Sequence, residues 1–175
     1  MTISRILRRG LAPTAAALVG SLLLYAEWMR RPPTADDPKG DAVVVHAGPD
    51  QRLGHALELM ERGAAPTLVI MYGRYRSDID GVCGQTDPYE VLCPTPDLRT
   101  TIGEARTLRR LVQDRGWQTV ITVTSDYHLR RATYLDAKYG KVKAIGSGAG
   151  QDLSRREAFR RTLREMAAMI QARLS

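Results

Sequence analysis

Short runs of β-branched and other apolar residues alternate with helix-like segments along most of this chain. The runs cover residues 42–46, 67–71, 120–123 and 142–145, and turn-forming residues flank each of them. Strands that alternate with helices in this way favour right-handed crossovers and a mainly parallel sheet covered on both faces. The sequence therefore predicts an α/β domain, a Rossmann-like three-layer sandwich with a mainly parallel sheet of four or five strands.

Helical patterns fill the spaces between these runs, at residues 51–62, 102–115 and 127–138, and a last helix is expected over about residues 154–173. In this last helix, apolar residues recur at helical spacing, which is typical of a stripe that packs on the core. We expect its arginines to face solvent or anionic lipid. The residues of the stripe are Phe159, Leu163, Met166, Ile170 and Leu174.

The amino-terminal part of the chain differs from the rest. Residues 10–26 carry no charged side chain, and three arginines precede them. A run of this length can just cross a hydrocarbon core of about 30 Å. A cleaved signal peptide is the alternative, although no clear A-x-A site follows the run. The sequence predicts a transmembrane anchor over residues 1–31, a Pro-rich extended linker over 32–40 and the α/β domain over 41–175.

Two features predict the side of the membrane on which the domain lies. Cys83 and Cys93 are the only cysteines, in a turn-rich stretch, and an oxidising compartment would let them pair. Two independent thiols are the alternative. Three arginines precede the apolar run and two follow it, which favours a cytoplasmic amino terminus. We expect a single-pass protein of the cell membrane with an extracytoplasmic domain, held in lipid by its amino-terminal helix.

The net charge of +7 does not indicate a nucleic-acid partner, because the excess lies at the two ends. Residues 1–31 hold five arginines and one glutamate, and residues 154–175 hold six arginines and two glutamates. The middle of the chain is nearly neutral, and one Phe and two Trp offer few platforms for bases. The histidines and cysteines show no recognisable metal-ligand spacing, so no metal site is predicted.

The segment VTSDYHLRRA, residues 123–132, lies where a strand is expected to lead into a helix. Ser125 suits the N-cap position, which puts His128 and Arg131 on one helix face in the first turns. A helix amino terminus with an arginine suits a phosphate or carboxylate, and a histidine can donate or accept a proton. A capping serine, a solvated arginine and a packed histidine are the alternative.

Two further segments follow expected strands or loops. In RTTIGEA, residues 99–105, Thr101 and Glu104 fit a capping box. In HAGPDQR, residues 46–52, Gly48 permits close backbone approach and Arg52 lies on the next helix. Ligands of parallel sheets bind beyond the carboxyl ends of the strands. We therefore expect Arg52, Thr101, His128 and Arg131 to face one cleft.

Nucleotide and hydrolase motifs are missing from the sequence. The chain contains no G-x-G-x-x-G, no G-x-x-x-x-G-K-[ST], no G-x-S-x-G and no H-E-x-x-H. The sequence leaves the cofactor unknown.

The three segments together resemble the SanA, YdcF and ElyC family over about residues 41–148. The resembling motifs are VVVHAG with Arg52, TTIGEA, and VTSDYHLRRA, of which the last is the most specific. Glu104 stands where many members of that family have Asn. The resemblance implies a Rossmann-like sheet, an amino-terminal membrane anchor, and a link to envelope integrity, peptidoglycan and its lipid carrier.

The resemblance and the motifs lead to a functional expectation, in which the domain handles a phosphate-bearing or anionic envelope intermediate such as a polyprenyl-linked glycan. His128 and Glu104 are the expected catalytic residues. Two alternatives stay open: a non-catalytic binding module that regulates the envelope, and an S-adenosylmethionine site with apolar space near Gly48 and Gly73. The residues expected to bind the substrate are Gly48, Arg52, Thr101, Ser125 and Arg131.

Overall fold

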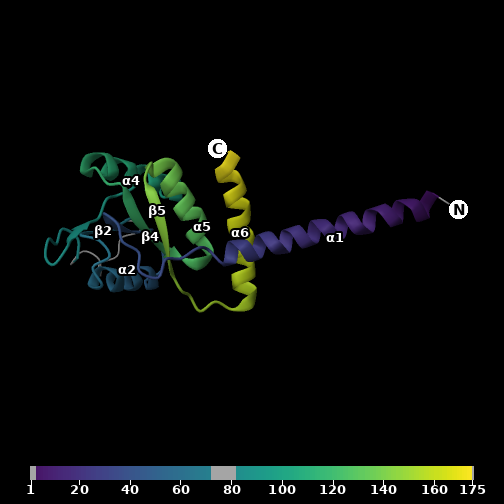
Figure 1. The fold of residues 1–175 in the computed structure, drawn as a ribbon, viewed down its shortest axis with the longest axis horizontal. Helices are drawn as coiled ribbons and strands as arrows, with labels where there is room; N and C mark the ends of the chain where they lie inside the picture. Colours follow the sequence, from purple (N-terminus) through teal and green to yellow (C-terminus); the bar gives the residue numbers. More distant parts are fainter. Residues whose placement is uncertain (1–2, 72–81, 175) are drawn as a thin grey trace.

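The computed structural model describes residues 3–71 and 82–174 and has an α/β architecture (Figure 1). In chain order its elements are α1 (Ile3–Arg30), β1 (Ala42–Val45), α2 (Gln51–Glu61), β2 (Thr67–Ile70), β3 (Glu90–Leu92), α4 (Thr101–Arg115), β4 (Thr119–Ser125), α5 (Asp126–Leu135), the π-helix η1 (Asp136–Gly140), β5 (Lys143–Ala149) and α6 (Arg155–Leu174).

The sheet has five strands in the order β3-β2-β1-β4-β5, and every neighbouring pair is parallel. This order is consistent with a Rossmann-like arrangement, so the predicted α/β fold with a parallel sheet is confirmed. The connection from β3 through α4 to β4 takes the chain from one half of the sheet to the other, so the strand order reverses between the neighbouring strands β1 and β4. The edge strand β3 was not predicted as a separate run, because its three residues lie inside a stretch rich in turns.

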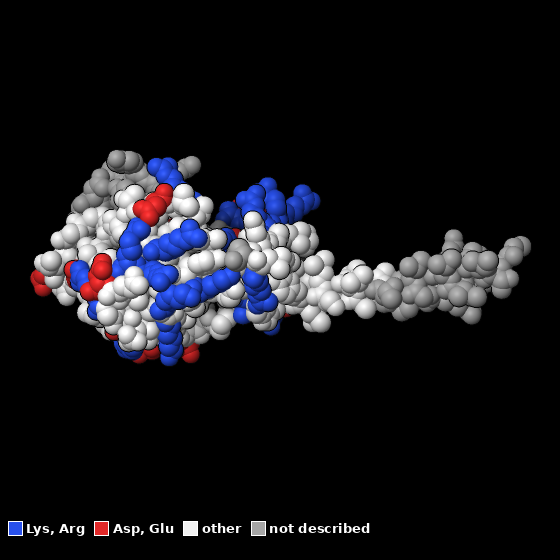
Figure 2. Space-filling model, turned by 90° about the horizontal axis from the view of Figure 1, so that it is seen from above, with Lys and Arg blue, Asp and Glu red and all other residues white. Residues whose placement is uncertain are grey.

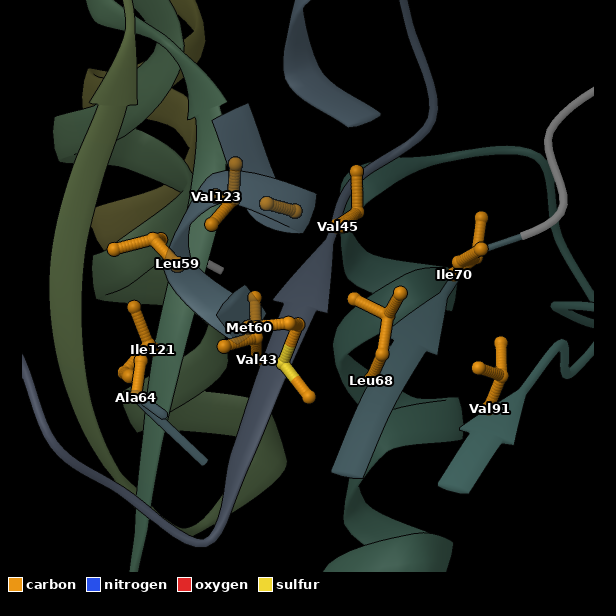
Figure 3. Close-up of a cluster of buried hydrophobic side chains, with 11 residues drawn as sticks. Val43, Val45, Leu59, Met60, Ala64, Leu68, Ile70, Val91, Ile121 and Val123 are labelled. Carbon is orange, nitrogen blue, oxygen red and sulfur yellow. The ribbon is translucent and has the colours of Figure 1, made fainter. Parts of the chain in front are cut away.

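The buried side chains of the central strands alternate between the two faces of the sheet. Val43 and Val45 of β1 pack toward α2, with Leu59 and Met60, as Figure 3 shows. On the other face, strand residues pack against α4 in a second cluster that includes Ala42, Val44, Leu108 and Val112. Helices therefore cover both faces, as expected for a parallel sheet whose strands are apolar along their whole length.

Cys83 and Cys93 form a disulfide, with their Cα atoms 5.7 Å apart. The predicted pairing is confirmed. Both residues pack against the cluster on the α2 side of the sheet. The remainder of the predicted loop, residues 72–81 with Gly73, lies outside the described residues.

The carboxyl end of α1 is attached to the α/β domain, while the helix extends away from it (Figure 1). Met29 is buried against Met166 and Met169 of α6. Nε of Arg130 donates to the carbonyl of Trp28 at 3.0 Å, and the guanidinium lies 3.6 Å from the centre of the Trp28 ring. In the described part of the chain, no helix combines the length and the apolar character that a membrane crossing needs.

The linker over residues 32–40 contacts the domain along its length. The amide of Ala35 donates to the carbonyl of Gly146 at 3.3 Å, and the amide of Gly40 donates to the carbonyl of Ala64 at 3.1 Å. The segment is thus a strap that lies on the domain rather than a free tether.

The structure contradicts the predicted core-facing stripe of α6 at four of its five positions. Met166 is buried, but the exposed fractions are 58% for Phe159, 39% for Leu163, 53% for Ile170 and 84% for Leu174. The helix instead buries a mixed face of small, polar and methionine side chains: Thr162, Glu165, Met166, Met169 and Ala172. The prediction was wrong because periodicity shows that a helix has an apolar face but does not show which neighbour covers it.

Candidate functional site

A cavity of about 290 Å³ lies at the carboxyl end of the sheet, in the region where the chain turns from β1 into α2 and from β4 into α5. Ligands of open α/β sheets bind at this type of switch point. The structure brings Arg52, Thr101, His128 and Arg131 together around the cavity, as the sequence analysis expected. The ionisable side chains that line it are Arg52, Arg99, Glu104, Tyr127, His128, Arg131 and Glu165.

Arg52 reaches the cavity from the first turn of α2 and is almost fully buried. Its Nε donates to Oγ of Ser125 at 3.0 Å, and its Nη1 donates to the carbonyls of His46, at 3.3 Å, and of Ala47. Burial, the largest influence, lowers the pKa of the Arg52 guanidinium from its usual value. Arginine side chains nevertheless stay protonated in proteins. The guanidinium therefore links the turn after β1 to the end of β4.

Gly48 allows this packing. A Cβ at position 48 would lie 2.3 Å from Cζ of Arg52, so any larger residue would displace the guanidinium. Ser125 stands at the N-cap position of α5, as predicted, but its hydroxyl makes no capping hydrogen bond. It accepts the Arg52 hydrogen bond instead. Both residues thus hold Arg52 in position and lie behind the cavity wall.

Glu104 does not form the predicted capping box. The N-cap of α4 is Thr100, whose side chain accepts from the amide of Gly103 at 3.1 Å. The register of the helix start is one residue earlier than predicted, so Glu104 falls outside the capping position and its side chain turns inward. Oε1 of Glu104 accepts from the amide of Ala47 at 2.9 Å, and Oε2 lies 2.8 Å from Nδ1 of His46.

His46, directly after β1, lies fully buried between two carboxylates. Its Nδ1 is 2.8 Å from Glu104, and its Nε2 is 2.8 Å from Oδ2 of Asp136, which also accepts from the hydroxyl of Thr122 at 2.7 Å. Burial by itself lowers the pKa of His46, but the nearby Asp136 and Glu104 outweigh it and raise that pKa to about 10. His46 is therefore an imidazolium that donates both of its N–H groups. It holds Glu104 in place from behind the cavity.

The same interaction acts on Glu104. Burial raises the pKa of this carboxyl, yet the imidazolium of His46 and the hydrogen bonds outweigh burial and hold the pKa below its usual range. Glu104 is thus an ionised, fully partnered carboxylate. This environment suits a positioning residue better than the acid-base role that the sequence analysis expected.

His128, Arg131 and Glu165 form a second cluster in the lining of the cavity. Nε of Arg131 donates to Oε2 of Glu165 at 2.6 Å, and Nδ1 of His128 lies 3.1 Å from the same oxygen. Burial raises the pKa of Glu165, but the hydrogen bonds from His128 and Arg131 dominate and lower it to about 2. Glu165 is therefore an anion that orients both neighbours.

His128 is held neutral. Burial is the largest influence on its pKa, and the net result is a value below 6.5 in spite of the attraction of Glu165. Nδ1 lies 3.1 Å both from Glu165 and from Nη2 of Arg131, and it cannot donate to one and accept from the other at once. The carboxylate is the stronger partner, and Arg131 already donates to it, so we assign the proton to Nδ1. Nε2 then carries a lone pair, 3.5 Å from the hydroxyl of Thr101.

The arrangement combines cations with one uncharged base. Three arginines and two glutamates line the cavity, which gives an excess of one positive charge when His128 is neutral. Arginine is the side chain that best matches the oxygens of phosphates and carboxylates. The cavity can therefore hold a small anion beside a histidine nitrogen that is able to accept a proton.

Sequence reasoning missed part of the site. No role in the site was assigned to His46, Arg99, Asp136 or Glu165. His46 could have been found, because a histidine directly after a buried strand needs polar partners. Nothing in the local pattern indicates Asp136 or Glu165, since each reaches the site from an element remote in sequence.

Comparisons of the chain with protein-family models, with curated proteins and with solved structures returned no match. Among the described side chains, no group of three or more His, Cys, Asp and Glu is placed to hold a metal ion. The imidazole of His46 has no lone pair to offer a metal, since both of its nitrogens donate to carboxylates.

Proposed function

We propose that this chain binds a phosphate-bearing or similarly anionic intermediate of the cell envelope in the cavity between α4 and α5. The observation that carries the proposal is that His128 and three arginines, Arg52, Arg99 and Arg131, line the same cavity. The resemblance of the three motifs to the SanA, YdcF and ElyC family supports an envelope role, with a polyprenyl-linked glycan as the type of ligand. The proposal includes a domain that is attached to the membrane and lies outside the cytoplasm. The disulfide supports the extracytoplasmic location, because disulfides persist in oxidising compartments.

In this proposal each residue has a defined part. The arginines neutralise the oxygens of the phosphate, and Arg52 is preorganised by Ser125 and the turn at Gly48. Nε2 of His128 accepts the proton of a hydroxyl or water that attacks the phosphorus, while the bond from phosphorus to the leaving oxygen breaks and that oxygen departs with the electron pair. Thr101 and Glu165 orient His128, and His46 holds Glu104 so that the wall of the cavity stays ordered.

Arg99 is the residue that tests anion binding most clearly. It is exposed at the cavity, whereas Arg131 holds the buried Glu165, so that removal of Arg131 would disturb folding and binding together. We expect Arg99→Ala to weaken the binding of inorganic phosphate and of a short polyprenyl phosphate at least about tenfold, or about 1.4 kcal/mol. Isothermal titration calorimetry of the full chain in detergent measures this.

Arg109→Ala is the matched control, because Arg109 is also exposed, lies on α4 and does not line the cavity. It removes the same charge and should leave both affinities within about twofold. Equal affinities for the two variants and the unmodified chain would contradict the proposed anion site.

A non-catalytic regulator is the second candidate, and one observation favours it. Arg131 is already paired with Glu165, and Arg52 with Ser125 and two carbonyls, so two of the three cations have protein partners before a ligand arrives. His128→Gln separates the candidates. It should abolish product formation in an enzyme and change only the affinity in a binding module.

A further inference from the structure

The exposed face of α6 carries a continuous apolar stripe. Phe159, Leu163, Ile170 and Leu174 follow one another at intervals of four, seven and four residues, which puts them on one side of the helix. All four are exposed, while the buried face of the helix, with Glu165, Met166 and Met169, packs toward α5 and α1. The stripe therefore has no partner within the described part of the chain.

Arginines accompany the stripe. Arg156, Arg160, Arg164 and Arg173 are exposed on the same helix. The only two carboxylates of α6 are occupied, since Glu157 accepts from Arg161 and Glu165 accepts from Arg131. The outer face of the helix thus combines large apolar side chains with uncompensated positive charge. This composition is typical of helices that lie in the interface of an anionic bilayer.

The position of α6 in the molecule is also consistent with contact to a bilayer. The helix runs across the end of the domain from which α1 leaves, as Figure 1 shows. Basic side chains lie on both sides of that exit in Figure 2. Beyond the exit, α1 exposes Leu18, Leu22, Leu23 and Leu24. Apolar side chains of two helices therefore gather at one end of the molecule.

We propose that α6 docks on an anionic lipid surface, with Phe159, Leu163, Ile170 and Leu174 inserted among the acyl chains and the exposed arginines at the lipid phosphates. Leucine and phenylalanine gain free energy when they leave water, and long arginine side chains reach back to the headgroups. Charge selects this occupant, because a protein partner would need a matching acidic and apolar groove, whereas an anionic bilayer offers both properties at once.

Docking of α6 would bring the cavity next to the headgroups. Glu165 lies on the inner face of α6 and lines the cavity, and a neighbouring polar hollow is lined by Tyr127, Glu165 and three arginines of α6. A ligand that remains attached to a lipid could then reach the cavity without leaving the membrane. This second step rests on the proposed function, whereas the docking of α6 does not.

The experiment measures the depth of the helix in the bilayer. A nitroxide label is attached at Leu163→Cys, or at Phe159→Cys as a second site, in the full chain reconstituted into vesicles of phosphatidylcholine and phosphatidylglycerol. The native cysteines are paired in the disulfide and do not take the label. Gln113→Cys on the exposed surface of α4 is the control.

We expect collisions of the labels on α6 with oxygen to exceed those with a water-soluble nickel complex, and nickel access to fall several-fold relative to Gln113→Cys. Omission of phosphatidylglycerol should restore part of that access. Nickel access equal to that of the control would overturn the proposal. Equal protection in detergent and in vesicles, together with cross-linked dimers, would assign the stripe to a second copy of the chain instead.

A triple variant separates this inference from the proposed function. Phe159→Ser, Leu163→Ser and Ile170→Ser together should reduce the partition of the chain's carboxyl-terminal helix into vesicles, and should leave phosphate binding in detergent unchanged, because none of the three residues lines the cavity. Unchanged protection of α6 in this variant, followed with the nitroxide at Leu174→Cys, would contradict the docking.

Discussion

The two buried histidines of the site show how opposite behaviour arises within a short distance. The ring centres of His46 and His128 are 6.4 Å apart, and both side chains are almost completely buried. His46 lies between two carboxylates, and its pKa rises to about 10. His128 shares one carboxylate with Arg131, and its pKa is lowered. Burial acts on both rings in the same direction, so the neighbouring charges decide the outcome.

The difference assigns different roles to the two residues. An imidazolium that donates to two carboxylates has a structural role, since it has no free lone pair and keeps both of its protons at neutral pH. A neutral imidazole with one nitrogen facing a cavity is able to take part in proton transfer. The histidine that the motif indicated is thus the one suited to chemistry, and the histidine that it did not assign supports the surrounding wall.

The largest expected effect comes from removal of His46. His46→Ala leaves Glu104 and Asp136 buried without their common partner, and we expect it to lower the free energy of unfolding by about 3–5 kcal/mol. Denaturant titration of the full chain in detergent measures this loss. His55→Ala is the control, because His55 is partly exposed and makes polar contacts with the hydroxyl of Ser147 and, at 3.8 Å, with the exposed carboxylate of Glu58, so that its loss should cost about 1 kcal/mol or less. Equal losses for the two variants would contradict the ion-pair account of His46.

Removal of the disulfide should lower the stability of the chain without affecting the histidines. Cys83 and Cys93 pack on the α2 side of the sheet, whereas His46 meets α4 and η1 on the other side. Replacement of both cysteines by serine should lower the free energy of unfolding by about 2–3 kcal/mol. The pH dependence of stability should keep its form. A changed pH dependence in this double variant would show that the two sides of the sheet are coupled.

The alkaline pH dependence of the free energy of unfolding reports on His46, with a change per pH unit that is smaller than either loss above. The pKa of His46 is higher in the folded chain, about 10, than its usual 6.5, so its contribution to stability is complete below about pH 6.5 and is lost as the pH rises toward 10. The free energy of unfolding should fall by about 1.4 kcal/mol per pH unit between these limits. The same measurement on His46→Gln gives the contribution of other groups, and an identical slope in that variant would exclude His46 as the source.

The loss of stability at acid pH depends on the cluster of His128, Arg131 and Glu165. Glu165 has a pKa of about 2 in the folded chain, below the usual 4.5, so its contribution is present above about pH 4.5 and is lost as the pH falls toward 2. His128 acts in the same direction, because its lowered pKa means that the unfolded chain takes up the proton first. The two clusters thus limit stability from opposite ends of the pH range.

Local patterns in the sequence were sufficient for four of the five strands of the sheet and for part of the site. Runs of β-branched residues gave the central strands, and parallel connectivity was enough to bring Arg52, Thr101, His128 and Arg131 to one cavity. The partners of these residues could not be predicted in the same way. Asp136 and Glu165 come from η1 and α6, and their contacts depend on how helices pack rather than on the spacing of neighbours.

The predicted cap of α4 and the predicted core-facing stripe of α6 were wrong for different physical reasons. At α4, two threonines in succession can each cap the helix, and the structure uses Thr100 where the pattern favoured Thr101. At α6, the apolar residues do recur at helical spacing, but only Met166 of the stripe is buried, where it packs with Met169 against Met29 of α1. Competing caps and alternative apolar faces are both decided by tertiary contacts, which a single sequence does not specify.

The most direct test of the account is nitrogen-15 NMR of the imidazole rings, because the chain has only three histidines. His55→Ala and His128→Gln assign the signals. We predict that both nitrogens of His46 remain protonated up to about pH 9, and that His128 is neutral at pH 7 with its proton on Nδ1. A neutral His46 at pH 7, or a charged His128 at the same pH, would contradict the division of roles between the two histidines.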